Sequence, residues 1–154
     1  MMVPAGSHGD ERLWHMDITV EDRFAIQDLY AKYWRAVDTC DAESWADVFT
    51  DDGKRSYADN SGGPDRAGRT FTGRRELLGL RAPRPPRHRH WYGPPVLTDK
   101  GDYLESVVYG MVVDITQDPP AIMAHHTFTD ELVRLPDGSW RMRSCLSTRD
   151  LVRA

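Results

Sequence analysis

The chain has 154 residues, of which 40% are hydrophobic and 29% charged, and this length fits one globular domain with a single buried core. Its net charge of −4 offers no basic surface for a nucleic acid backbone, and no apolar run reaches the roughly 18 residues that a membrane span needs. We therefore expect a cytoplasmic protein that has neither nucleic acid nor a membrane as a partner.

The ends and the cysteines set further bounds. Residues 1–16 are rich in Gly, Pro, Ser and charge, so we expect a flexible N-terminal segment followed by one domain over residues 17–154. Cys40 and Cys145 lie far apart without a metal-binding spacing, which argues against a disulfide scaffold and a structural zinc site. A Gly-rich phosphate loop and a nucleophile elbow are both missing, which argues against nucleotide-driven and serine-hydrolase chemistry.

A long first helix is predicted from its cap and its periodicity. Thr19 followed three residues later by Asp22 is typical of a capping box. Apolar side chains then recur at i, i+3, i+4, i+7 and i+11, which forms one stripe on a 3.6-residue period. The members of this stripe are Ile26, Leu29, Tyr30, Tyr33 and Val37. The pattern predicts a helix that runs to about Asp38.

Shorter elements follow. We expect Asp41 to cap a second helix that reaches residue 49, and residues 50–53 to form a polar turn. A strand over residues 54–58, a loop over 59–69 and a third helix over 74–80 come next. Arg81, Arg84, Arg87 and Arg89 stand among prolines, and we expect them to form a solvated lid where a phosphate or coenzyme A group could dock.

The second half of the chain consists of alternating, β-branched runs. They span residues 88–97, 103–115, 122–135 and 139–148. Short turns at residues 99–101, 117–120 and 136–138, of the kind that connect antiparallel neighbours, join each run to the next. Helices followed by consecutive strands predict an α+β fold, in which a curved antiparallel sheet wraps around a long N-terminal helix and two shorter helices. Such a cone has an apolar interior suited to a small molecule.

Three segments carry a family resemblance. Residues 26–30, 45–53 and 137–141 resemble the SnoaL-like group of the NTF2-like superfamily, and the resemblance extends over roughly residues 17–149. The group includes dehydratases, isomerases, cyclases, epoxide hydrolases and non-catalytic members, so the resemblance is specific for the NTF2-like cone and not for a reaction. It also implies a homodimer or higher homo-oligomer that associates through the open face of the sheet.

Individual residues match two enzyme families within that group. Residues 32–38 are similar to the first-helix segment of the bile acid 7α-dehydratases, which implies catalytic roles for Tyr33 and Asp38. His90 matches a strand histidine of those enzymes and of the scytalone dehydratases. Tyr57 matches a tyrosine of both families, and Arg149 matches an arginine of the bile acid enzymes. The resemblance therefore implies that both residues bind substrate.

The chain also departs from both families. An acidic residue of the bile acid enzymes corresponds to Met111 or a neighbour, and a second strand histidine of the scytalone dehydratases corresponds to a hydrophobic residue near Val113. A tyrosine of the scytalone enzymes aligns with Cys40. These departures leave the reaction open.

The residue types support an acid–base pair. The helix dipole disfavours a negative charge at Asp38. Desolvation among Tyr33, Trp34 and Trp45 would suit the Asp38 carboxylate to proton transfer. The alternative is that Asp38 is a solvated aspartate that begins a turn. His90 on an adjacent strand would accept or deliver the proton. Tyr33 would act as an acid or oxyanion donor, although an aromatic side chain on a helix stripe is more often core packing.

Other histidines offer alternatives. His88 shares a strand face with His90, and we expect it to be exposed. Only one of His125 and His126 can point inward, and we expect His126 to line the mouth. A metal site would need three of these side chains to converge, without any supporting motif, so no metal is expected.

The sequence therefore predicts a cofactor-independent lyase with Asp38, His90 and Tyr33 as catalytic residues. It would dehydrate a hydrophobic small-molecule substrate, a polycyclic or aromatic hydroxy-carbonyl compound such as a steroid or polyketide intermediate. Tyr57, Arg149, Trp34, Trp45 and His126 would bind this substrate. An isomerase or polyketide cyclase would use the same pair, and a non-catalytic binding or assembly module remains a further alternative. An epoxide hydrolase would need a water-holding Asp–Arg–Asp cluster, for which the sequence offers no clear candidate.

Overall fold

The computed structural model describes residues 17–59, 62–81 and 85–150, and the expected segment 1–16 lies outside these residues. The element order confirms an α+β domain in which the helices precede most strands. The elements are α1 (Val20–Thr39), α2 (Ala42–Ala46), β1 (Phe49–Tyr57), the 3-10 turn η2 (Pro64–Arg66), β2 (Thr70–Thr72), α3 (Gly73–Gly79), β3 (His88–Tyr92), β4 (Val96–Asp99), β5 (Leu104–Asp114), β6 (Ala121–Arg134) and β7 (Trp140–Arg149).

Helix α1 forms as its sequence predicts. The Thr19 hydroxyl accepts the Asp22 N–H at 3.1 Å, and the Asp22 carboxylate accepts the Thr19 N–H at 3.2 Å, so the capping box is complete. All five residues of the predicted apolar stripe are buried. The helix ends at Cys40, whose φ of 56° is left-handed and turns the chain directly into α2.

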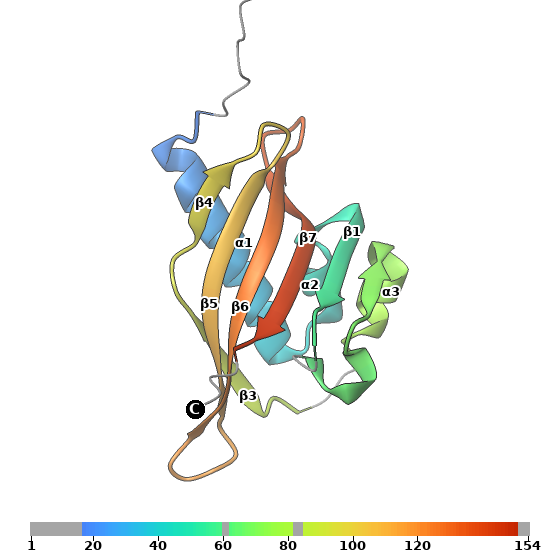
Figure 1. The fold of residues 1–154 in the computed structure, drawn as a ribbon, viewed down its shortest axis with the longest axis vertical. Helices are drawn as coiled ribbons and strands as arrows, with labels where there is room; N and C mark the ends of the chain where they lie inside the picture. The colour runs from blue at the N-terminus through green and yellow to red at the C-terminus, as the bar shows by residue number, and fades with distance from the viewer. Residues whose placement is uncertain (1–16, 60–61, 82–84, 151–154) are drawn as a thin grey trace, which may run out of the picture.

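The strands form one curved sheet in the order β2-β1-β7-β6-β5-β3, and β4 also pairs with β5. Pairing is antiparallel except between β1 and β7, which run parallel. Helix α1 crosses behind the sheet in Figure 1, while α3 lies beyond the β1 edge. The buried core fills the space between α1 and the concave face, where Leu104, Leu132 and Met142 are fully buried.

Three boundaries differ from the prediction. Residues 50–53 are not a turn but part of β1, because a register shift between Phe49 and Lys54 lets this polar stretch stay in the strand. The turn η2 lies within the stretch 59–69, which was expected to be a loop, and the short strand β2 that follows this stretch was not predicted. The run 88–97 is divided into β3 and β4, because Pro94 and Pro95 have no N–H to donate to the ladder with β5.

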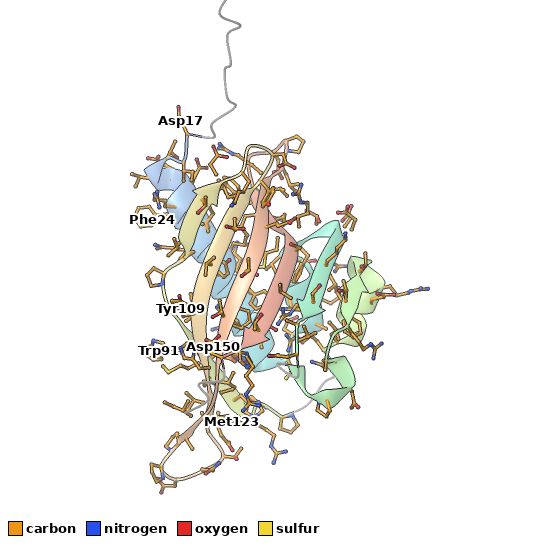
Figure 2. All side chains as sticks on the ribbon, in the orientation of Figure 1. Asp17, Phe24, Trp91, Tyr109, Met123 and Asp150 are labelled. Carbon is orange, nitrogen blue, oxygen red and sulfur yellow. The ribbon has the colours of Figure 1, made fainter. Side chains whose placement is uncertain are left out.

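Among the described residues, no helix is long and apolar enough to cross a membrane. The sheet has one face on the core and one face at the surface. On β5, for example, Tyr109 is exposed, while its neighbours Val108 and Gly110 are buried. Figure 2 shows Trp91 and Tyr109 together at the β3–β5 side of the sheet.

Candidate functional site

A cavity of about 500 Å³ opens between the C-terminal half of α1 and the concave face of the sheet. Its size lies within the range of small-molecule sites. Side chains of α1, β1, β3, β6 and β7 contribute to its wall, together with the residues around η2 and after α3. The principal ones are Tyr33, Trp34, Arg55, Tyr57, Arg66, Arg81, His88, His90, His126, Phe128 and Arg149.

Asp38 and His90 form a close pair, in which His90 lines this cavity and Asp38 lies behind it in a smaller neighbouring pocket. Oδ1 of Asp38 lies 2.6 Å from Nδ1 of His90, and both carboxylate oxygens lie 3.2 Å from the His90 backbone N–H, which donates to them. The side chains are 13% and 18% exposed, respectively, so the pair is shielded without being sealed. Because the carboxylate occupies Nδ1, Nε2 of His90 has no partner among the described residues and can exchange a proton.

The backbone and an aromatic ring fix this pair. Asp38 lies in the last turn of α1, two residues before the left-handed Cys40. His90 is held in β3 by pairing opposite Val112 of β5. Trp34, one helical turn before Asp38, stacks on the imidazole with ring centres 5.1 Å apart and an interplanar angle of 18°. The ring orientation of His90 is therefore set by the carboxylate on one side and the indole on the other.

Aromatic side chains build the wall beside the pair. Trp34 packs edge-to-face on Phe128 at 4.8 Å and on Tyr33 at 4.6 Å. Trp45, which we expected to bind substrate, is fully buried outside the cavity lining and packs on Phe49 and Tyr33. The reason is that the inward face of α2 points into the core beneath the cavity, so the expected placement of Trp45 is wrong.

The two predicted tyrosines both line the cavity. Tyr33 is buried, its hydroxyl lies 3.8 Å from the Cys145 sulfur, and burial raises the pKa of Tyr33, so the phenol stays protonated. Tyr57 ends β1 with its ring under the guanidinium of Arg55, at 4.3 Å from the ring centre. Two phenols therefore contribute to the cavity wall.

The consecutive histidines separate as strand geometry requires. His126 is buried and lines the cavity, while His125 is exposed and pairs through Nδ1 with Asp150 at 2.6 Å. Burial, with the nearby Arg55 charge, lowers the pKa of His126 to about 4, so this histidine is neutral at physiological pH. Arg149 lies beside it at the cavity wall and donates weakly to the Met123 carbonyl at 3.4 Å.

Three residues that line the cavity were not predicted to do so. His88, expected to be exposed, is half-buried and lines the cavity two positions before His90. Arg81, expected in a solvated lid, instead lies over the Trp45 ring at 4.5 Å. Arg55 is buried, and its position two residues before Tyr57 is the signal that could have revealed it, because alternate residues of a strand share a face.

The polar side chains of the cavity favour proton transfer and not metal binding. Within the described ranges, no three His, Cys, Asp or Glu side chains are grouped so that they could hold a metal ion. The polar groups that do converge are one carboxylate–imidazole pair, two phenols and several guanidiniums. Chemically, this combination can move a proton and stabilise negative charge on an oxygen.

Comparisons with known proteins give the same fold. A family model described as a SnoaL-like domain matches residues 19–145. ActVI-ORFA from Streptomyces coelicolor superposes with a TM-score of 0.71 and 22% identity, covering 84% of this chain and 97% of its own. An NTF2-like protein with a cystatin-like fold from Novosphingobium aromaticivorans gives 0.69 and 22%, with coverages of 83% and 81%.

A third structure is assigned as the beta subunit of an aromatic-ring-hydroxylating dioxygenase from Novosphingobium aromaticivorans. Its TM-score is 0.67 at 22% identity, and the match covers 85% of this chain and 90% of that one. No curated protein matches the sequence significantly. At these identities the structural likeness establishes the NTF2-like cone and leaves the chemistry to the side chains in the cavity.

Proposed function

Because the chain belongs to the SnoaL-like family, we propose that it is a cofactor-independent acid–base enzyme, a dehydratase of polycyclic or aromatic hydroxy-carbonyl compounds. The observation that carries the proposal is the 2.6 Å contact between Asp38 and His90, whose imidazole lines a cavity of about 500 Å³ together with aromatic side chains and arginines. A histidine held by a carboxylate through one nitrogen and free at the other is suited to general acid–base catalysis.

The first step is removal of a proton from the carbon beside the substrate carbonyl. Nε2 of His90 takes this proton while Asp38 holds Nδ1–H and stabilises the imidazolium that forms. The C–H electron pair becomes the C=C bond of an enolate, and the negative charge moves to the carbonyl oxygen. Donors inside the cavity must then stabilise that oxygen.

The second step expels the hydroxyl group. As the enolate electrons return to form the conjugated double bond, the C–O bond breaks, and the proton on His90 Nε2 goes to the departing hydroxyl to give water. Tyr33 is the proposed hydrogen-bond donor to the enolate oxygen, since burial raises its pKa and keeps the phenol protonated. Tyr57, His126 and Arg149 line the space that the rest of the substrate would occupy.

Isomerisation and cyclisation begin with the same proton abstraction, so the site supports them as runner-up reactions. A test should therefore detect the shared first step. We would incubate the enzyme in D2O with a cyclic ketone that has no leaving group, and follow exchange of the proton beside the carbonyl by NMR. Turnover of hydroxy-ketosteroids and β-hydroxy polyketide ketones, read as new enone absorbance, then identifies dehydration.

The matched control is the second Asp–His pair. His125 and Asp150 have the same Nδ1–carboxylate distance of 2.6 Å, but His125 is outside the cavity lining and exposed. We expect His90→Ala to slow exchange and turnover by about 10²- to 10⁴-fold and His125→Ala to leave both unchanged. If ligands bind while neither reaction occurs in the wild type, the protein is a binding or assembly module of this fold.

A further inference from the structure

We propose that Arg55 and Arg81 form an anion-binding subsite in the cavity, and that it takes the carboxylate group of a planar aromatic ligand. The inference deepens the proposed function by naming a substrate class, and it rests on that function only for the reaction at the far end of the ligand. Binding of the carboxylate depends on the two guanidiniums alone.

Arg55 is a buried cation that interacts with the buried Asp130 at longer range but contacts no carboxylate directly among the described residues. It is 4% exposed, and no ion pair joins it to a carboxylate within the part of the chain that the structure describes. Its terminal nitrogens donate to the carbonyls of Ser56 and Cys145 at 2.9 and 3.1 Å and to the Ser147 hydroxyl at 3.0 Å. These bonds hold the guanidinium in place, while its buried Nε has no hydrogen-bond partner. Three of the five N–H donors of this fixed cation are engaged, and two remain, on Nε and on one Nη atom.

Arg81 supplies the second cation. Its guanidinium lies 4.5 Å from the centre of the Trp45 ring, and its buried Nε also lacks a partner. Across the described residues, its side chain makes neither an ion pair nor a hydrogen bond, so none of them engages the terminal nitrogens of this cavity-lining guanidinium. A planar fork of this kind binds a carboxylate through two parallel hydrogen bonds.

The surrounding charges leave this part of the cavity electropositive. Burial alone would raise the pKa of Tyr57, yet the cations of Arg55, Arg81 and Arg66 together lower it. Asp65 is the carboxylate among the described lining residues, and it is exposed and makes no ion pair within them. Because a buried charge without a counter-ion is costly, a bound anion would offset that cost.

The ligand class follows from what connects the cations to the acid–base pair. The Arg55 guanidinium lies 5.8 Å from the centre of the Phe128 ring, Phe128 packs on Trp34 at 4.8 Å, and Trp34 stacks on His90 at 5.1 Å. This chain of rings forms a continuous aromatic wall. A flat ring system lying on the wall, with its carboxylate at the arginines, would present its other end to His90.

The test compares two isosteric probes, 2-naphthoate and 2-naphthamide, by titration of the full-length protein with calorimetry. We expect the wild type to bind the carboxylate at least ten-fold more tightly than the amide. Arg81→Met keeps a flexible side chain over Trp45 but removes the charge, so the preference should vanish. Arg75→Met removes the same charge from the exposed surface of α3 and should retain the preference.

Three results would overturn the subsite. The wild type could bind both probes equally well, it could bind neither, or Arg81→Met could retain the preference for the carboxylate. Arg81→Lys separates charge from shape, and a partial preference there is expected because lysine keeps the cation without the planar fork. His90→Ala must retain the full carboxylate preference. A protein that passes this test but catalyses no proton exchange would contradict the proposed function and leave the subsite standing.

Discussion

Nδ1 of His90 lies 2.6 Å from Oδ1 of Asp38, although 52 positions separate the two residues in the chain. The carboxylate sits at the C-terminal end of α1, where the helix dipole opposes its charge. Contacts with the imidazole and with the His90 N–H offset that unfavourable position. The arrangement fixes the tautomer and the orientation of the His90 imidazole, as a role in proton transfer requires.

Asp38→Asn should retain the fold and lose activity. The amide oxygen can still accept a hydrogen bond from Nδ1–H, but the neutral side chain no longer stabilises the imidazolium formed during proton transfer. We expect kcat/KM to fall by about 10²-fold or more, with the melting temperature nearly unchanged. Asp150→Asn alters the matched outer pair and is the control. Equal losses in both variants would argue that the effect is structural.

Tyr33→Phe separates catalysis from packing at a buried position. The ring contacts Trp34, Trp45 and Phe49 and is retained in the variant, while the hydroxyl contacts only the Cys145 sulfur at 3.8 Å among the described residues. Losing so weak a bond should change the free energy of unfolding by less than about 1 kcal/mol. If the hydroxyl stabilises the enolate, kcat should fall about 10²-fold while KM changes little. An unchanged kcat would assign Tyr33 to the core.

The first helix was predictable because its signals are local. The capping pair of Thr19 and Asp22 and the 3.6-residue stripe both lie within one segment, and the structure reproduces them. The division into β3 and β4 was signalled by Pro94 and Pro95, but the β-branched run on either side concealed it. The start of β1 was missed, because a bulge allows polar residues to continue a strand where composition indicates a turn.

The site was predictable only in part, for a related reason. Family resemblance indicated both Asp38 and His90, and strand alternation indicated that only one of His125 and His126 points inward, which the structure shows to be His126. Arg55 and Arg81 were missed because arginine is ordinarily exposed, and no local pattern reveals that the closure of the sheet over α1 and α3 encloses two of them. The positive charge of the cavity comes from residues that are far apart in the chain and meet only in the folded protein, so no local sequence pattern reveals it.

Apolar side chains on the outer face of the sheet lead us to propose a homodimer. Trp91 is 73% exposed and Tyr109 is 62% exposed, and the pairing of β3 with β5 places Trp91 opposite Met111, two residues along β5 from Tyr109 on the same face. We expect the wild type to be dimeric by light scattering, and Tyr109→Glu combined with Trp91→Glu to give a monomer, because burying two carboxylates is unfavourable. Phe24→Glu on α1 is the control, since Phe24 is 64% exposed away from the sheet. A monomeric wild type would contradict the proposal.

The buried Asp130 should make stability depend on pH. Its side chain is enclosed with the Tyr30 hydroxyl and Cys145, and burial raises the pKa of Asp130 to about 6 from an ordinary value of 3.8. Below pH 3.8 the carboxyl is protonated in both states; between about pH 4 and 6 the folded protein keeps a proton that the unfolded chain releases. The free energy of unfolding therefore falls as pH rises through this window, by about 3 kcal/mol for the whole shift.

His126 has the opposite effect over nearly the same window. Burial lowers the pKa of His126 to about 4, so the unfolded chain takes up the proton first and stability is lost as pH falls from about 6.5 to 4. The two contributions partly cancel in the wild type, so the pH dependence of one protein does not isolate either. The difference between the wild type and Asp130→Asn does, because the His126 contribution is common to both.

We expect Asp130→Asn to gain stability relative to the wild type by about 3 kcal/mol as pH rises from about 4 to 7, measured by urea unfolding. The amide keeps an acceptor for the Tyr30 hydroxyl, so the gain comes from removing a charge that the buried site disfavours. Asp51→Asn, on the exposed part of β1, is the control and should parallel the wild type. If Asp130→Asn also stays parallel to the wild type across this range, Asp130 ionises in the folded protein as readily as in the unfolded chain.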